Sequence, residues 1–313
     1  MKIGILFSGY GNQFVGMGKC AYDESRIIQE YFETASSCLD INFVKLCFAS
    51  SDVELATIKN AYLSLFLTNV ALYALLKDKG IQPHLIAGHG IGEYAAIYAA
   101  GGISFPDALY LLNKYATFYS EQIQNHQLAV LHVQGGDDAL LEQLCKEATN
   151  DEEFVAIAVH NAHDDHYVAG TRDAVETFRI ASLAYADVRC INVDEGYGIH
   201  ADMMEPVLEK LNVYLPKVDF KDLKIPVITC VDAVRIVSSE PAKMSLLRQV
   251  HNPILWSQVM ANFAGCDAII TVGPGAYVQK LVAQRYPEKK VLMLSTLQDM
   301  VQVVELLNQK PKE

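Results

Sequence analysis

The chain has 313 residues, and its 37 acidic and 25 basic side chains give a formal net charge of -12. This balance opposes binding to nucleic acid or to an anionic membrane surface, so we expect neither as a partner. The apolar run at residues 3–7 is too short for a secretory signal, no segment approaches a membrane-spanning length, and seven scattered cysteines indicate reduced thiols, so we expect a cytoplasmic protein.

The first 126 residues are predicted to alternate between strands and helices. Short apolar runs next to glycine predict the strands, and apolar residues at helical spacing predict the helices. A Gly-x-Gly pair follows the first strand but lacks the third glycine of a dinucleotide fingerprint, so we expect no nucleotide cofactor. The predicted elements are strands at 3–7 and 85–88 and helices at 24–48, 52–79, 93–100 and 106–125.

The pattern changes between residues 127 and 194. Strands and helices there follow the order βαββαβ, which is typical of a ferredoxin-like unit. We expect residues 127–194 to form an inserted small subdomain. The predicted strands are 128–133, 154–159, 166–169 and 188–193, and the predicted helices are 138–149 and 172–185.

Strands and helices alternate again after residue 194. Such alternation on both sides of an insertion predicts a mostly parallel sheet covered by helices. The fold class is therefore α/β, with one large domain made of residues 1–126 and 195–313 around the insertion. The predicted elements of the second part are helices at 200–211 and 244–263, strands at 226–231 and 268–272, and a further helix after 275.

The segment Gly88-His89-Gly90-Ile91-Gly92 lies between a predicted strand and an alanine-rich helix. A strand, a sharp turn and a helix are the setting of the nucleophile elbow G-x-S-x-G, in which the serine hydroxyl faces helix N-terminal amides. The middle position here is Gly90, so the pattern predicts an acyl-transfer site but lacks its nucleophile.

Three histidines and two aspartates lie close together between residues 160 and 166. Imidazole and carboxylate groups are ligands that zinc accepts. The segment is, however, predicted to be a turn between two strands, where alternation points neighbouring side chains to opposite faces. We therefore expect a polar hairpin turn and no metal ion.

Motifs in order along nearly the whole chain resemble the malonyl-CoA:acyl carrier protein transacylase family, the acyltransferases of fatty acid and polyketide synthesis. Several motifs in the right order are more specific than any one of them. The resemblance implies an α/β-hydrolase-like large domain with the ferredoxin-like insertion. The matching segments are 7–13 with 16–18 (F-P-G-Q-G-x-Q…G-M-G in the family), 88–94 (G-H-S-x-G-E-Y), Asn161 with 168–170 (N-S-P…I-A-G), 199–206 (S-H-x-x-L-M-x-P), 248–253 with Trp256, and 272–275.

The resemblance implies ping-pong acyl transfer. In the family a histidine activates the elbow serine, which takes an acyl group from coenzyme A and passes it to a phosphopantetheine thiol. His200 holds the position of that histidine, and the backbone carbonyl of Gln249 holds the position that orients it. The backbone N–H groups of Tyr10 and Ile91 correspond to the oxyanion donors. His89 is expected to support the elbow, and Asn161 is expected to border the cleft.

Four positions depart from the family pattern. Gly90 cannot form the acyl-enzyme, and loss of a triad nucleophile typically removes about a millionfold of rate. The family's arginine for the substrate carboxylate corresponds to Tyr115, although Lys114 supplies a point charge if the register is shifted by one. Tyr10 and Tyr62 replace two family glutamines. The three tyrosine rings either narrow the cleft and form hydrogen bonds through their hydroxyls, or they reflect sequence drift in a pocket that is no longer used. The sequence leaves both interpretations open.

Three hypotheses follow for the function. The first is a divergent acyltransferase acting on acyl thioesters of coenzyme A or acyl carrier protein, with serine-mediated malonyl transfer lost or altered and with His200 able to act as general base for thioester hydrolysis. The second is a non-catalytic homologue that docks a carrier protein as a scaffold. The third is an ordinary acyl carrier protein S-malonyltransferase with a serine-to-glycine change. The expected partners are acyl carrier protein and acyl-CoA, with no bound cofactor.

Overall fold

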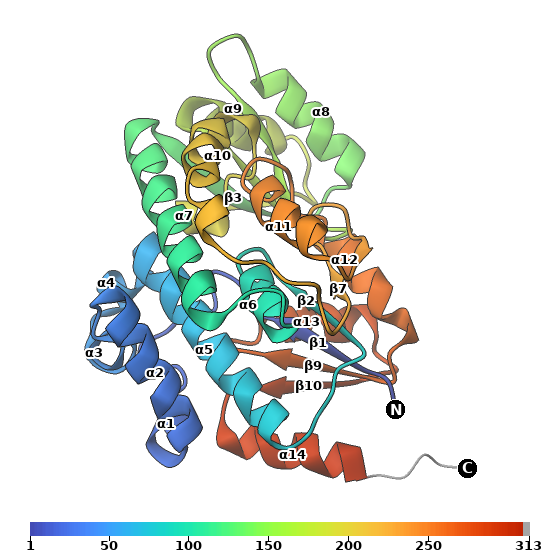
Figure 1. Ribbon diagram of the computed structural model, residues 1–313. Helices are drawn as coiled ribbons and strands as arrows, with labels where there is room; N and C mark the ends of the chain where they lie inside the picture. The colour runs from blue at the N-terminus through green and yellow to red at the C-terminus, as the bar shows by residue number, and fades with distance from the viewer. Residues whose placement is uncertain (309–313) are drawn as a thin grey trace.

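The computed structural model of the chain describes residues 1–308, so the last five residues of the predicted large domain lie outside it. The larger of its two sheets has six strands in the order β10-β9-β1-β2-β7-β8 (Figure 1). All neighbours are parallel except the edge pair β7 and β8. The predicted α/β class with a mostly parallel sheet is thus confirmed. The strands are β1 (Ile3–Phe7), β2 (Leu85–Gly88), β7 (Val227–Ile228), β8 (Arg235–Ile236), β9 (Ala268–Val272) and β10 (Lys290–Leu294).

The register of the central strands brings three loops to one edge of this sheet. Phe7, the last residue of β1, pairs with Gly88 on one side and with Val272 on the other. Strands that are parallel and in register end at the same edge, so the loops after β1, β2 and β9 meet there. The crevice at these carboxyl ends is where α/β sheets place their ligands, and the predicted elbow follows β2.

The helices of the first part pack mainly around α5, whose residues from Ala61 to Tyr73 are all buried. The helix predicted at 24–48 is divided, because Asp40 adopts a left-handed conformation with φ 55° and ends α2. No helix within residues 1–308 is long and apolar enough to cross a membrane. The helices are α1 (Lys19–Glu24), α2 (Arg26–Leu39), α3 (Phe43–Ala49), α4 (Asp52–Ala56), α5 (Ile58–Asp78), α6 (Gly92–Ala99) and α7 (Phe105–Asn125).

The second sheet is antiparallel, with the strand order β4-β5-β3-β6. Its elements follow the predicted βαββαβ order, and an apolar cluster of its own lies between the sheet and its two helices. Figure 1 shows this unit at one end of the molecule, opposite β10 and α14. That residues 127–194 form a ferredoxin-like subdomain of their own stays a proposal, and the separate core supports it. The elements are β3 (Leu128–Gln134), α8 (Asp138–Ala148), β4 (Val155–Ala162), β5 (Asp165–Thr171), α9 (Arg172–Ser182) and β6 (Arg189–Val193).

The last third of the chain differs most from its prediction. The helix predicted at 200–211 starts only at Glu205, after a 3-10 turn, and the helix predicted at 244–263 is broken between residues 249 and 255. Pro253 explains this break, since proline lacks an N–H group and disfavours helix at the residue before it. The prediction also missed β8, β10 and α14. The helices are α10 (Glu205–Asn212), α11 (Ser239–Arg248), α12 (Trp256–Ala261), α13 (Tyr277–Arg285) and α14 (Leu297–Asn308), and the 3-10 turns are Glu195–Tyr197, Asp202–Met204, Leu215–Lys217 and Asn262–Gly265.

Candidate active site

The turn between β2 and α6 forces three backbone segments into very close contact. A Cβ atom on Gly88 would lie 2.0 Å from the carbonyl carbon of Gly92, and one on Gly92 would lie 2.8 Å from the Ser8 carbonyl oxygen. The His89 N–H donates to the Phe7 carbonyl at 3.0 Å, which fastens the turn to the end of β1. Only glycine fits at positions 88 and 92, because any side chain there would strike backbone.

Gly90 lies at the tip of this turn under a different constraint. Its φ is 52°, in the left-handed region, yet no heavy atom lies within 4 Å of a Cβ atom built on it. The left-handed conformation costs another residue about 1–2 kcal/mol, but the space is free for a side chain. The strained turn of the elbow is therefore kept at the position that the resemblance assigns to the nucleophile.

His200 is buried and hydrogen-bonded to the carbonyl oxygen of Gln249 through Nδ1. A carbonyl only accepts, so Nδ1 carries the proton and Nε2 is the basic nitrogen. Nε2 packs so closely on Gly198 that a Cβ atom there would lie 2.2 Å from it. Burial lowers the pKa of His200 to about 4, although the hydrogen bond to Gln249 opposes this shift. The imidazole is therefore neutral at physiological pH.

Gly90 and His200 line one small cavity together with His89 and Ile91. Its volume is about 10 Å³, roughly the least that holds one water molecule. The two positions that the family mechanism requires thus face the same space, but that space is too small for an acyl group.

Three tyrosine rings form much of the wall of this cavity. Tyr10, Tyr62 and Tyr197 line the cavity, and the ring of Tyr10 packs edge-on against the other two at centroid distances of 5.7 and 5.2 Å. The Tyr62 hydroxyl donates to the Gly196 carbonyl at 2.9 Å, and the Tyr10 hydroxyl donates to the Ala56 carbonyl at 3.0 Å. Both hydroxyl groups are therefore bonded to backbone, and burial raises the pKa of each phenol.

The structure places Tyr115 and Lys114 away from this cavity. Tyr115 is buried behind Tyr62, with ring centroids 5.9 Å apart, and stacks on Tyr94 at 6.5 Å. The Lys114 ammonium lies 4.8 Å from the ring centroid of Tyr214. Neither side chain lines the cavity at the elbow, and within residues 1–308 no arginine or lysine does.

His89 connects the elbow to the small sheet. Its Nε2 lies 2.8 Å from the Asn161 side-chain oxygen, and Asn161 donates to the Asp165 carboxylate at 3.0 Å. The His89 ring also packs edge-on against Trp256, at a centroid distance of 4.9 Å. Burial lowers the pKa of His89, so the ring is neutral and Nε2 donates to the amide oxygen. Asn161 reaches the elbow through His89 and does not itself line the cavity.

The two backbone groups expected to stabilise an oxyanion flank the same turn. Within residues 1–308, neither the Tyr10 N–H nor the Ile91 N–H donates a hydrogen bond to a backbone carbonyl. Ile91 precedes the first residue of α6, so its amide lies at the positive end of a helix. That these two amides form an oxyanion hole beside Gly90 stays a prediction.

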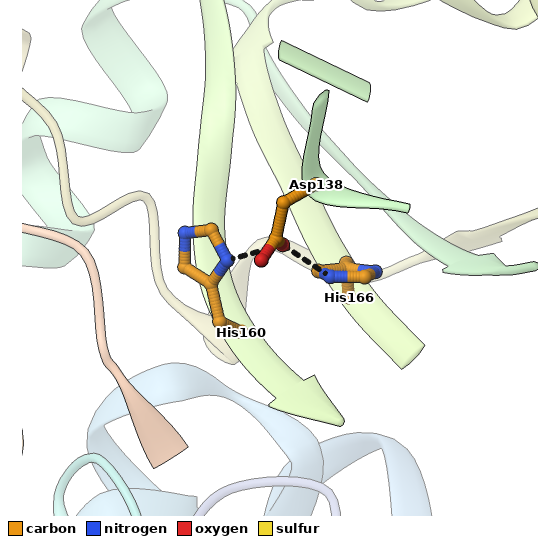
Figure 2. Close-up of side chains that lie close together, drawn as sticks. All are labelled: Asp138, His160 and His166. Carbon is orange, nitrogen blue, oxygen red and sulfur yellow. Dashed lines mark hydrogen bonds and ion pairs between the residues drawn. The ribbon is translucent and has the colours of Figure 1, made fainter. Parts of the chain in front are cut away.

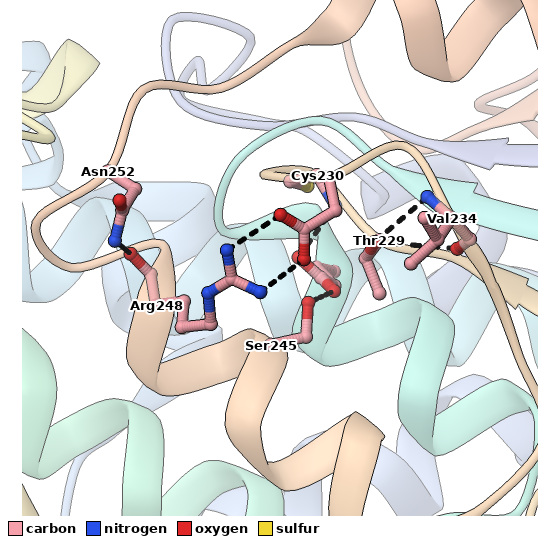
Figure 3. A network of polar contacts seen from close by, with 8 residues as sticks. Thr229, Cys230, Val234, Ser245, Arg248 and Asn252 are labelled. Carbon is pink, nitrogen blue, oxygen red and sulfur yellow. Dashed lines mark hydrogen bonds and ion pairs between the residues drawn. The ribbon is translucent and has the colours of Figure 1, made fainter.

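A buried carboxylate connects the elbow helix to the segments that carry Cys230 and Ser245, both labelled in Figure 3. Glu93 is fully buried in the first turn of α6 and accepts hydrogen bonds from the Ser245 hydroxyl and, at 3.3 Å, from the Cys230 N–H. Burial raises the pKa of Glu93, while these two hydrogen bonds oppose the shift. Nearby, the Arg248 guanidinium donates to the Asp232 carboxylate at 2.7 Å. Glu93 thus connects the elbow helix to α11 and to the loop after β7.

The sequence did not identify four residues that complete the cavity. Gly196 and Tyr197 come from the 3-10 turn before His200, and Val159 and Ile254 come from β4 and from the break between α11 and α12. Tyr197 could have been predicted to line the cavity, because it lies only three residues before His200 in the sequence. Val159 and Ile254 meet only because β4 and the break pair with each other, which no local pattern shows.

Comparisons with known proteins agree with this architecture. The model of the family described as "Acyl transferase domain" matches residues 5–304. The malonyl CoA-acyl carrier protein transacylase of Bacillus subtilis is 30% identical over 100% of this chain and 98% of its own length. The solved malonyl CoA-acyl carrier protein transacylase of Clostridium perfringens has a TM-score of 0.91 at 25% identity and covers 98% of this chain and 97% of its own. A malonyl-transacylase solved with its type II PKS acyl-carrier protein has the same fold, with a TM-score of 0.93 at 24% identity, covering 98% of this chain and 100% of its own.

The contrast between Gly88 and Gly90 is testable. We expect Gly88→Ala to lower the free energy of unfolding by at least about 3 kcal/mol, because its Cβ atom would strike backbone. Gly90→Ala should cost only about 1–2 kcal/mol, because its Cβ atom meets open space and only the left-handed φ is penalised. Urea unfolding of the two variants measures the difference, and equal losses would contradict the elbow geometry.

Proposed function

Because this chain belongs to the acyl transferase family, we propose that it is an acyl carrier protein S-malonyltransferase in architecture and partner class, with glycine in place of the nucleophilic serine. The observation that carries the proposal is that Gly90 and His200 face one cavity while the Gln249 carbonyl fixes the imidazole. A base, its orienting carbonyl and two free amides are kept around a position that lacks only a side chain.

Acyl carrier protein is the partner class that we propose. A solved protein of the same fold is a malonyl-transacylase in complex with its acyl-carrier protein. Coenzyme A and phosphopantetheine thioesters are the proposed substrates, because the relatives of this chain are malonyl CoA-acyl carrier protein transacylases. Acyl transfer between such thiols needs no metal or redox cofactor. The binding of an acyl group at the elbow requires the tyrosine rings around the 10 Å³ cavity to move aside.

Within residues 1–308, no thiol beside the elbow is placed to replace the missing nucleophile. Cys230 is fully buried, and its thiol donates to the Gly88 carbonyl at 2.8 Å. Burial raises the pKa of this thiol well above its usual value, and a thiol rather than a thiolate is a poor nucleophile. The present chain therefore forms no acyl-enzyme.

Restoring the serine tests the proposal. We expect Gly90→Ser to become acylated by malonyl-CoA or acetyl-CoA and to pass the acyl group to holo acyl carrier protein, because a hydroxyl at residue 90 enters the cavity that His200 lines. Intact-mass spectrometry measures the adduct, and the rate should rise several orders of magnitude above that of the present chain.

Two controls make this result specific. Gly90→Ala occupies the same space without a hydroxyl and should show no adduct, and Gly90→Ser with His200→Ala should lose most of the labelling rate. Labelling by acetyl-CoA alone would indicate that the missing arginine has removed malonate selection. If the folded Gly90→Ser variant is not acylated by either donor, the transferase proposal fails and the docking hypothesis remains.

The pH profile of the Gly90→Ser variant follows from His200. Burial lowers the pKa of His200 to about 4, and the neutral imidazole is the base, so protonation is what stops the reaction. We expect the acylation rate to stay constant from about pH 8 down to about pH 5 and to fall only as the pH approaches 4. Rapid-quench labelling across this range measures it. A midpoint near 6.5 would show that His200 titrates as an exposed histidine.

One observation favours a second candidate, the hydrolysis of acyl thioesters. The open space at Gly90 holds about one water molecule, and His200 lines the same cavity. We expect any such activity of the present chain to be weak and to disappear in His200→Ala. Thiol release from malonyl and acetyl carrier-protein thioesters measures it, and a rate that is unchanged in His200→Ala would exclude this role.

A further inference from the structure

A second polar cluster lies where the start of α8 meets β4 and β5 (Figure 2). His160 on β4 and His166 on β5 are directly paired across the two strands, and Asp138 is the first residue of α8. The sequence predicted that alternation would separate these histidines within a turn. That reasoning was wrong for this pair, because residues opposite each other on neighbouring strands share a face, and the turn itself covers only residues 163–164.

The three side chains converge on one point. The Asp138 Oδ1 atom lies 2.9 Å from His160 Nδ1 and 2.8 Å from His166 Nε2. Dashed lines mark both contacts in Figure 2. One nitrogen from each imidazole and one carboxylate oxygen lie within 4.8 Å of one another. Bond lengths of about 2.0–2.2 Å to a central zinc ion separate ligand atoms by roughly 3.3 Å, so a small outward movement of the carboxylate makes room for the ion.

The burial of the three residues suits such a movement. His166 is fully buried and His160 is 18% exposed, so the sheet holds both imidazoles in place. The Asp138 side chain is 59% exposed on the first turn of a helix and is free to adjust. The cluster therefore has two fixed nitrogen ligands, one adjustable oxygen ligand, and an open side where water completes the coordination.

We propose that Asp138, His160 and His166 form a binding site for a divalent transition-metal ion, with zinc as the ion that fits best. Two imidazoles and one carboxylate with open positions are a ligand set that zinc accepts, whereas magnesium and calcium prefer oxygen ligands throughout. The second nitrogen of His166 is buried and has no hydrogen-bond partner within residues 1–308. No hydrogen bond on this nitrogen orients the ring once Nε2 binds the ion, so the affinity is lower than in a closed structural zinc site.

The ion would connect the first turn of α8 to the two strands beneath it. Three coordinate bonds to the ion would replace the two hydrogen bonds that share one oxygen of Asp138. Zinc would therefore stabilise the small sheet together with α8. None of the three ligands lines the cavity at Gly90. The site is therefore independent of the proposed function, and its test needs no enzyme activity.

Equilibrium dialysis of the full chain, prepared without an affinity tag and stripped with EDTA, tests the site. The unchanged chain should retain about one zinc ion and show a higher melting temperature with zinc but not with magnesium. His160→Gln and Asp138→Asn should each weaken zinc binding at least about tenfold. His163→Gln is the matched control, because His163 is exposed in the adjacent turn and should bind zinc as the unchanged chain does.

Cobalt substitution provides a measurement that does not depend on the folding of variants. Cobalt(II) bound to the unchanged chain should give visible absorption bands that zinc displaces at a ratio of about one to one. Failure of the unchanged chain to retain zinc or to show these bands would overturn the proposal. So would zinc binding that is the same in folded His160→Gln and Asp138→Asn as in His163→Gln.

Discussion

The close backbone contact between the elbow and the loop after β1 is the constraint on which the rest of the site depends. Gly88 and Gly92 allow α6 to start directly against the Phe7–Ser8 backbone, and the in-register pairing of β1 with β2 and β9 fixes where that contact lies. A side chain at either glycine would push the helix away from the sheet. The amides beside Gly90 and the position of the tip follow from this contact and not from the residue at the tip.

Some residues of the site are kept because the packing of the fold needs them. Others would be kept only if they contacted a substrate. The Gln249 carbonyl and the His200 imidazole are buried together, and removing one would leave the other without a partner, so their retention has a structural reason as well as a chemical one. The residue at position 90 has no such packing role, because its side-chain space is empty. Tyr10 and Tyr62 use their hydroxyls on backbone carbonyls, which gives their rings a structural role in the cleft.

The sequence predicted the elements with strong local signals and missed those defined by distant partners. The apolar run before the elbow and the alanine-rich helix after it were enough to locate the elbow, and the family resemblance led to His200 and Gln249. The two-residue strand β8 has almost no periodicity of its own and exists through pairing with β7, which lies within the predicted strand at 226–231. The placement of Tyr115 behind Tyr62, and the approach of Asp138 to two histidines, depend on tertiary packing, which spacing along the chain does not encode.

The break between α11 and α12 has a mechanical consequence. It supplies the Gln249 carbonyl at one end, while at the other Ile254 hydrogen-bonds to both Ala158 and His160 along the open edge of β4. One short stretch of chain thus orients the imidazole and extends the small sheet. A rotation of that sheet against the larger one would pull on the carbonyl that aligns His200. The two units are therefore linked through the same segment that aligns the base.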